Sequence, residues 1–294
     1  MKYTVSHSTL YKYALSVSNC YNLAYMIPRN TETQQVEAIA IKLSPEPTSC
    51  NTRTDYFGNQ FLQFSIEKNH TELELNVIST IVIKDKFNSS NLDFGIPCSY
   101  VQYLLQQRKD SETLNAQEFI LDSPMVQQHA DLAEYAASSF ASDRPFLSAV
   151  LDLTQRIFRD FTYDPQFSDI ATPLADVLKH RRGVCQDFAH LAIGCLRSLG
   201  YPARYVSGYI ETIPLPGQEK LQGADATHAW FSVYSPGEGW YEFDPTNNQL
   251  TSEQYITTAW GRDYSDVTPL KGVIFGGGLS PQLCVSVDVR QLEG

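Results

Sequence analysis

Three side chains of this sequence have the types and the order that nucleophilic catalysis by a thiol requires. Cys185 lies in the segment GVCQDFAH, His228 in THAW and Asp244 in YEFDPT. A sulfur nucleophile needs a base to remove its proton, and a carboxylate on the far ring nitrogen fixes the tautomer of that base. His228 follows Cys185 by 43 positions and Asp244 follows His228 by 16, so the three groups meet only if the fold brings them together.

The residues after Cys185 predict an amphipathic helix. Apolar side chains recur with the three- and four-residue spacing of one helix face, at Phe188, Leu191, Ala192, Cys195, Leu196 and Leu199. Gly200 and Pro202 then end the pattern. Cys185 is therefore expected in the first turn, where unpaired backbone N–H groups and the helix dipole favour a thiolate. The alternative is a small, inert core cysteine, which is what free cysteines usually are.

Aromatic and β-branched runs at residues 227–234 and 239–244 predict a hairpin that carries the other two groups. His228 and Asp244 share strand parity, so an odd-length loop places them on one face. A three-residue loop at 235–237 pairs them directly, and a five-residue loop at 235–239 leaves them one diagonal step apart. A structural histidine and a turn-opening aspartate remain the alternatives.

Four blocks of the sequence, residues 183–189, 199–209, 228–230 and 243–246, are similar in order and spacing to the core of the transglutaminase-like superfamily, in its bacterial branch. The resemblance implies a papain-like arrangement and cysteine-protease chemistry, with Cys185 as nucleophile, His228 as base and Asp244 as orienting carboxylate. Residues 7–13 and 55–59 also resemble the β-rich region that precedes this core in many bacterial members.

Other side chains are candidates for contacts with the substrate. Family analogy suggests a second oxyanion donor, for which Tyr163 and Gln186 are the candidates, although both could equally be structural. Trp230 follows His228 by two residues and shares its strand face, so it is expected to wall the pocket unless it is a core aromatic. Arg204 matches the family pattern, and we expect it to form an internal ion pair.

Composition excludes some partners and narrows the cellular context. The net charge is −11 and the pI about 5.0, which argues against a nucleic-acid partner because phosphate binding needs clustered cations. Six scattered cysteines without a CxxC motif fit reduced thiols. The sequence has no apolar leader and no 18-residue apolar run, so a cytoplasmic protein without a membrane partner is expected. No cofactor is expected; zinc binding by the three groups is a minor alternative, since a second thiol is missing.

The order of strand-like and helix-like patterns along the chain predicts an α+β fold of two domains. Residues 1 to about 90 alternate like strands and predict a β-sandwich-like domain, 1–95, with a connector near 87–98. Helical periods at 132–140, 147–161 and 173–180 lead into the cysteine helix, and residues 203–292 return to strands. The second domain, 96–294, is therefore a papain-like or transglutaminase-like core in which the nucleophile helix packs on an antiparallel sheet.

Two Gly-containing segments call for separate interpretations. Residues 214–223 predict a surface loop just before His228, either a rim of the substrate groove or an idle connection. The run 276–278 lacks the spacing of phosphate-binding loops and predicts a turn before the strand at 285–289.

Three functions are consistent with these residues. The first is a thiol hydrolase or amidase that acts on a peptide or protein substrate through a thioester. The second is a transglutaminase that crosslinks proteins by transamidation, which requires an amine site that excludes water. The third is a non-catalytic binding module, whose usual mark would be the loss of a triad member. The oligomeric state and the substrate cannot be read from the sequence.

Overall fold

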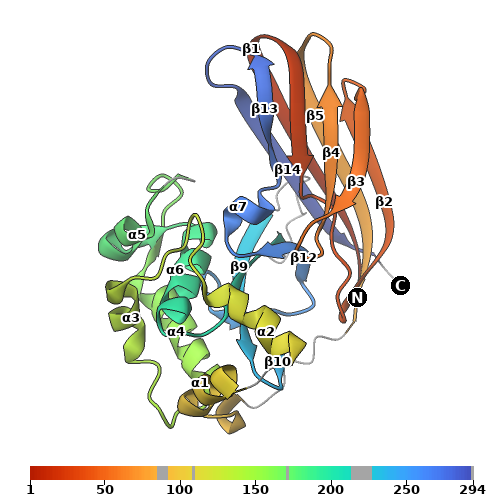
Figure 1. Cartoon of the computed structure of the whole chain (residues 1–294). Helices are drawn as coiled ribbons and strands as arrows, with labels where there is room; N and C mark the ends of the chain where they lie inside the picture. The colour runs from red at the N-terminus through yellow and green to blue at the C-terminus, as the bar shows by residue number, and fades with distance from the viewer. Residues whose placement is uncertain (85–91, 108–109, 170–171, 213–226, 293–294) are drawn as a thin grey trace, which may run out of the picture.

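The computed structural model describes residues 1–84, 92–107, 110–169, 172–212 and 227–292, and has the expected α+β architecture (Figure 1). A small five-stranded sheet lies between a group of helices and a larger sheet of long strands. The larger sheet carries both ends of the described chain. The expected loop at 214–223 lies outside the described residues.

The larger sheet is built around one long strand, β1 (Lys2–Ala24). The first half of β1 pairs with β5 and β14, and the second half pairs with β4 and β13. All of these pairs are antiparallel, and β2 and β3 form the outer edge beside β5 and β4. The bounds are β2 (Gln34–Ser44), β3 (Ser49–Thr54), β4 (Gln60–Ile66), β5 (His70–Ile83), β13 (Leu270–Gly276) and β14 (Gln282–Gln291).

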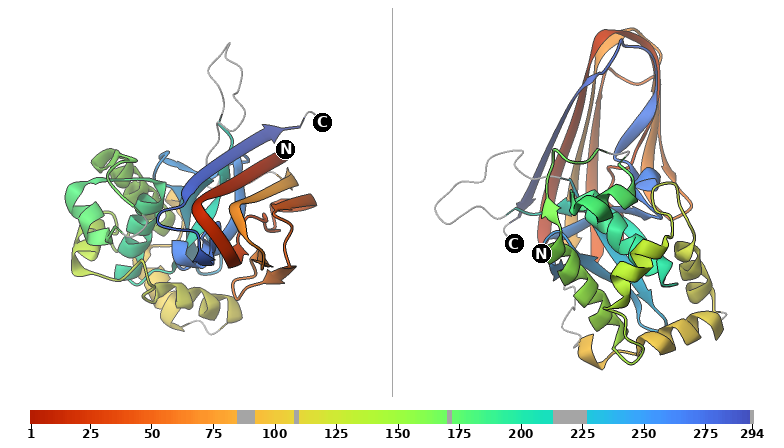
Figure 2. Two further views of the ribbon diagram at one scale, coloured as in Figure 1. Left: turned by 90° about the horizontal axis from the view of Figure 1, so that it is seen from above. Right: turned by 90° about the vertical axis from the view of Figure 1, so that its left-hand side faces the viewer.

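The sheet is sandwich-like because it folds over on itself near the middle of β1. The pairing register of β1 shifts between Lys12 and Asn19, and at the same position along the sheet the chain turns between β2 and β3, between β4 and β5, and between β13 and β14. At the last interruption Gly276, Gly277 and Gly278 all have positive φ, which glycine adopts without a Cβ penalty. The bends form the end of the sheet farthest from the helices (Figure 2). The folded sheet encloses its own apolar cluster, which includes Phe64 and Leu75.

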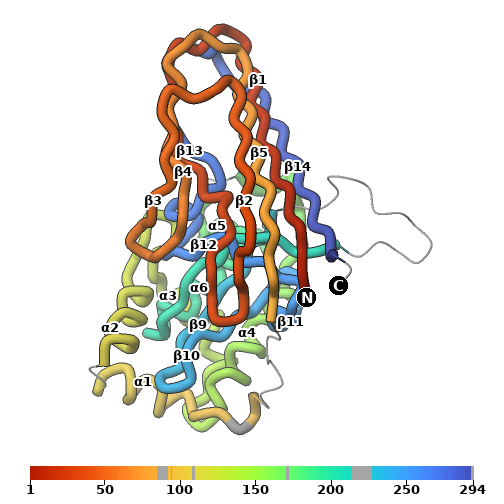
Figure 3. The backbone as a smooth tube through the Cα atoms, turned by 90° about the vertical axis from the view of Figure 1, so that its right-hand side faces the viewer, coloured from red at the N-terminus to blue at the C-terminus, as the bar shows by residue number. Residues whose placement is uncertain are grey.

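The C-terminal strands complete the N-terminal sheet, which the division into residues 1–95 and 96–294 did not anticipate. β13 and β14 pair with β1 over most of its length, as the adjacent red and blue tubes in Figure 3 show. The pairing joins residues from opposite ends of the chain, for example Val5 with Val289. No local sequence pattern reports such a contact, because strand signals do not specify the partner strand.

The smaller sheet has the order β11-β10-β9-β8-β12 and supports the candidate site. One face packs against helix α6 (Cys185–Ser198) through Tyr205, Phe231 and Val233. The sheet also contacts the N-terminal sheet, where Tyr209 and Ile256 pack against Tyr3. The bounds are β8 (Ala203–Ile210), β9 (Thr227–Ser235), β10 (Gly239–Asp244), β11 (Gln249–Leu250) and β12 (Tyr255–Gly261).

The helices surround α6 on its outer side. The predicted helices at 132–140, 147–161 and 173–180 correspond to α3 (Ala130–Ala137), α4 (Phe146–Asp160) and α5 (Leu174–His180). The connector expected at 87–98 lies partly outside the described residues and ends in a 3₁₀ turn, Leu92–Phe94. The remaining elements are α1 (Cys98–Gln107), α2 (Ser111–Gln117), a 3₁₀ turn at Glu118–Ile120, α7 (Tyr264–Val267) and the short parallel strands β6 (Thr162–Tyr163) and β7 (Arg182–Gly183).

Candidate active site

Cys185 is the first residue of α6, as the sequence predicts. The helix start is held by Asp187, whose carboxylate accepts hydrogen bonds from the Val184 N–H (2.8 Å) and the Ser168 hydroxyl (2.5 Å). Gly183 lies against the Asp187 side chain, and a Cβ at position 183 would be 2.8 Å from it. The backbone can therefore reach this geometry only with glycine before the cysteine, which fixes where the thiol leaves the helix.

His228 and Asp244 lie on adjacent strands in the diagonal register. Phe231 pairs with Phe243 and Ser235 with Gly239, so Asp244 lies one step diagonally from His228. This is the register that the longer of the two predicted loops gives. His228 Nε2 is 2.7 Å from Asp244 Oδ2, and the histidine is 9% exposed and the aspartate 0%.

Asp244 is a buried carboxylate saturated with donors. Its Oδ2 accepts hydrogen bonds from His228 Nε2, the Tyr255 hydroxyl (2.6 Å) and Asn247 Nδ2 (2.7 Å). Its Oδ1 accepts from the backbone N–H groups of Thr246 (2.8 Å) and Asn247 (3.2 Å). Burial favours the neutral acid, but these hydrogen bonds outweigh burial and lower the pKa of Asp244. The group is therefore a fixed anion.

The His228 imidazole is held between that anion and the thiol. Burial opposes a charge on the ring, whereas hydrogen bonds with Asp244 and Cys185 favour it and raise the pKa of His228 to about 10. Because Nε2 faces Asp244, Nδ1 is the nitrogen left for Cys185. Cys185, His228 and Asp244 thus meet from three separate elements, α6, β9 and β10.

The three substrate-contact candidates have different surroundings. Tyr163 is 53% exposed and lies on β6, directly beside Gly183 of β7. Burial and the nearby charges of Cys185 and Asp187 raise the pKa of Tyr163, which places its hydroxyl within electrostatic range of the thiol. Gln186 is half-buried in the first turn of α6.

Trp230 does not wall an open pocket. The residue shares the face of His228, as parity predicts, but it is 0% exposed and packs against Tyr255 with ring centroids 5.2 Å apart. Its indole N–H donates to Glu242 (3.1 Å), and its ring lies 6.0 Å from that of His228. Trp230 therefore supports the imidazole from behind rather than contacting a substrate.

Tyr255 and Asn247 were not identified from the sequence. Tyr255 lies on β12, two strands away from β9 across β8, so no local pattern pairs it with Asp244. Asn247 had a local signal, because Asp244 opens a turn and the residue three positions later can return a hydrogen bond.

The described residues offer little for a metal site or a membrane-spanning segment. Within them, no group of three histidine, cysteine or carboxylate side chains converges as metal ligands would. The longest of the described helices, α4, has 15 residues, and none of these helices has the length and apolarity of a transmembrane segment.

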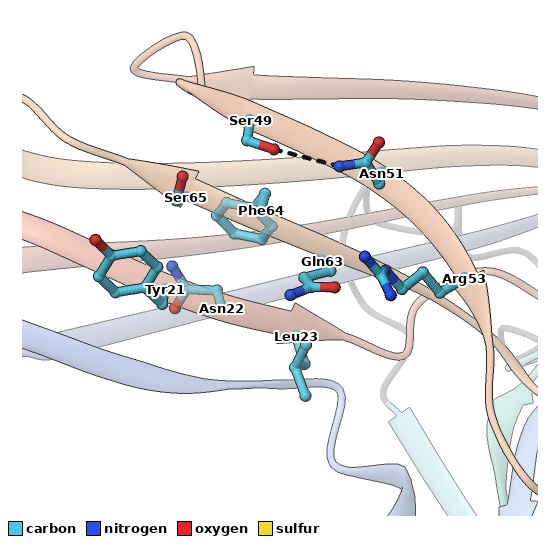
Figure 4. A pocket seen from close by; sticks show the side chains of 9 residues that line it. All are labelled: Tyr21, Asn22, Leu23, Ser49, Asn51, Arg53, Gln63, Phe64 and Ser65. Carbon is cyan, nitrogen blue, oxygen red and sulfur yellow. Dashed lines mark hydrogen bonds between the residues drawn. The ribbon is translucent and has the colours of Figure 1, made fainter.

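A cleft on the N-terminal sheet is lined by no cysteine, histidine or carboxylate (Figure 4). Its volume is about 310 Å³, and Asn51 donates to Ser49 (3.2 Å) on its rim. Amide, hydroxyl, guanidinium and aromatic side chains line it: Tyr21, Asn22, Leu23, Ser49, Asn51, Arg53, Gln63, Phe64 and Ser65. The cleft is thus separate in chemistry from the group around Cys185.

Comparison with known proteins assigns the family. Residues 3–82 match the bacterial transglutaminase-like N-terminal region, and residues 133–245 match the transglutaminase-like superfamily. An uncharacterized protein of Mycobacterium tuberculosis strain H37Rv is 38% identical over 297 residues, covering 100% of this chain and 94% of the relative. The chain belongs to the transglutaminase-like superfamily.

Two further comparisons concern the fold and a short segment. A Cytophaga hutchinsonii protein, provisionally called a cysteine protease, superposes with a TM-score of 0.77 at 22% identity, over 100% of this chain and 91% of that one. At this identity the likeness shows the fold alone. A protein-glutamine gamma-glutamyltransferase of Pseudomonas aeruginosa is 38% identical over 68 residues, which is 22% of this chain and 10% of that enzyme.

Proposed function

We propose that this transglutaminase-like protein is a thiol-dependent acyl-transfer enzyme that hydrolyses peptide or amide bonds. The single observation that supports this most is the continuous contact from the helix-start Cys185 through His228 to the buried Asp244. A structural cysteine needs none of these partners. Together they match the requirements of an activated sulfur nucleophile.

Attack begins from a thiolate and an imidazolium. The raised pKa of His228 keeps the ring protonated at neutral pH, and its hydrogen bond with Cys185 supports the ion pair that thiol catalysis requires. The thiolate adds to the carbonyl carbon of an amide or ester, and the oxyanion meets the Cys185 backbone N–H at the start of α6. The Tyr163 hydroxyl is the candidate for a second donor.

Breakdown of the adduct uses the same proton. His228 Nδ1 donates it to the leaving amine, the C–N bond breaks, and a thioester forms on Cys185. The neutral imidazole then takes a proton from water, which attacks the thioester and releases the acid and the thiolate. Asp244 stays ionised throughout and holds the ring through Nε2.

Transamidation is the second candidate, in which an amine replaces water in the last step. The observation that favours it is the local likeness to the Pseudomonas aeruginosa gamma-glutamyltransferase over 68 residues. A peptide or protein would serve as acyl donor in both reactions. We also propose that the protein works in the cytoplasm, in keeping with its unpaired cysteines, none of which forms a disulfide in the described residues.

Parallel assays separate the two reactions. The full-length protein is incubated with a peptide library, and both new peptide termini and incorporation of a labelled primary amine are recorded. Cys185→Ala should abolish both signals, whereas Cys284→Ala, which removes an exposed thiol on β14, should change neither. Activity that survives in Cys185→Ala contradicts the proposal.

A test of the thiol that needs no substrate is alkylation. At neutral pH, Cys185 should react with iodoacetamide faster than the exposed Cys50 and Cys284, because His228 keeps it as a thiolate. Peptide mapping by mass spectrometry gives the three rates in one sample. Equal rates at the three sites would contradict the ion pair.

A further inference from the structure

Arg204 is a buried cation that the proposed reaction does not use. The residue lies on β8 and is 8% exposed. Its guanidinium is stacked between two indole rings, 4.0 Å from the centroid of Trp240 and 3.8 Å from that of Trp260. Stacking on two aromatic faces orients the guanidinium plane and leaves its edge for hydrogen bonds.

The cation is poorly compensated. The Arg204 Nε is buried and has no hydrogen-bond partner among the described residues, so this nitrogen takes no part in the expected internal ion pair. Burial lowers the pKa of Arg204 to about 9. The charge of Glu242 opposes this effect, and the charge of Arg29, which is stacked on Trp260, adds to it. A buried charge is costly unless hydrogen-bonded partners surround it.

Arg204 opens into a cavity of about 680 Å³, within the size range of small-ligand sites. The cavity lies between the β9–β10 hairpin, β12, α2 and the segment before β2. The lining residues that matter for binding are Glu32, Glu112, Arg204, Trp240, Glu242 and Trp260. Arg204 is opposite Ser232 and Gly208 is opposite His228. The fully buried pair Val206 and Trp230 lies between these two residue pairs on β8 and β9, so the cavity is separate from the catalytic thiol.

The lining has both signs of charge at different depths. The guanidinium is buried and feels the charge of the half-buried Glu242, whereas Glu32, Glu112 and Glu238 are exposed. Water and salt screen the exposed carboxylates, so they do not prevent an anion from reaching Arg204, but they still attract a nearby cation. A ligand that carries one charge of each sign, a few atoms apart, can interact with both the buried guanidinium and the exposed carboxylates.

We propose that this cavity binds a small α-amino acid or short peptide as a zwitterion, with its carboxylate on Arg204 and its ammonium group at Glu32 and Glu112. A carboxylate accepts two parallel hydrogen bonds from a guanidinium, which supplies the partners that Arg204 lacks. The site goes beyond the proposed acyl transfer and does not depend on it.

Three matched ligands test the charge requirement. Glycylglycine carries both charges, N-acetylglycylglycine only the carboxylate, and glycylglycinamide only the amine. Each is titrated into the full-length Cys185→Ala protein, which excludes turnover, and the indole ¹H–¹⁵N signals of the three tryptophans are followed. We expect saturable shifts of the Trp240 and Trp260 signals with glycylglycine, several-fold weaker binding of the acetylated ligand and at least about tenfold weaker binding of the amide.

Two variants complete the test. Arg204→Gln should abolish binding of all carboxylate ligands, and thermal unfolding checks its fold, which removal of a poorly paired buried charge need not weaken. Glu32→Gln, an exposed change that leaves Glu112 in place, should lower glycylglycine affinity toward that of the acetylated ligand and leave the acetylated ligand unaffected. The result therefore does not rest on Arg204→Gln alone. Equal binding of the amide, persistence of binding in Arg204→Gln, or no shift at ligand concentrations well above millimolar would overturn the proposal.

Discussion

Replacing Asp244 with asparagine is the sharpest perturbation of the proposed triad. The carboxylate accepts three hydrogen bonds on Oδ2 and two on Oδ1, from His228, Tyr255, Thr246 and Asn247. An asparagine offers one acceptor oxygen, and its NH₂ group must then face the donors on the other side. Two or more buried donors lose their partners, at about 1–3 kcal/mol each.

The substitution should also impair catalysis directly. Asp244 is the anion that helps to keep the pKa of His228 near 10, so the variant loses the charge that stabilises the imidazolium. The same substitution in a serine-protease triad costs about 10⁴ in kcat, and we expect a loss of about 10³ or more here. The assay is kcat on a peptide substrate identified in the parallel screen, with urea unfolding of the same preparations.

Asp187→Asn is the matched control. This aspartate is also buried and lies two residues after Cys185, but it bonds Val184 and Ser168 rather than His228. We expect less than about a tenfold loss of kcat. If Asp244→Asn retained activity within tenfold of the wild type, or Asp187→Asn were as damaging while both remained folded, the assignment of the orienting carboxylate would be refuted.

Three further predictions concern neighbouring groups. The proton on His228 stabilises the native state fully below about pH 6.5, and this stabilisation is lost as the pH rises through about 10. The free energy of unfolding from urea titrations should therefore fall between these pH values more in the wild type than in His228→Gln, and an equal fall in both proteins would contradict this. Tyr255→Phe removes one hydrogen-bond donor to Asp244 and should lower kcat about tenfold and the free energy of unfolding by about 1–3 kcal/mol. It should also displace the pH profile of kcat/KM, and an unchanged profile would mean that Tyr255 serves only in packing. Gly183→Ala places a Cβ 2.8 Å from Asp187, so it should destabilise the fold by about 1–3 kcal/mol in thermal unfolding and lower kcat. Wild-type stability and kcat would mean that the start of α6 can accommodate a Cβ at position 183.

Local patterns were sufficient to predict the elements that carry the triad. Helical spacing after Cys185 predicts α6 and its first residue, and strand parity in the hairpin predicts that His228 and Asp244 share a face. Loop length left two registers open, because a turn segment with proline and glycine is compatible with both. Only the paired backbone of β9 and β10 decides between them.

Contacts between distant elements could not be predicted in this way. The pairing of β14 with β1, the donation from Tyr255 to Asp244 and the stacking of Arg204 on Trp260 all depend on which strand lies beside which. A strand pattern reports which residues face one side but not the partner strand. The burial of Trp230, which the sequence left open, depends on strand order in the same way, since Tyr255 of β12 and Val206 of β8 pack against it.

The covalent intermediate tests the central claim most directly. The protein is mixed with an activated acyl ester, quenched in acid within the first turnover and analysed by intact-mass and peptide-mapping mass spectrometry, with Cys284→Ala and Cys185→Ala in parallel. We expect one acyl group on the Cys185 peptide, present in Cys284→Ala, absent in Cys185→Ala and lost when the reaction is allowed to proceed. Turnover without an acyl group on Cys185, or an acyl group that accumulates only on other cysteines, would contradict it.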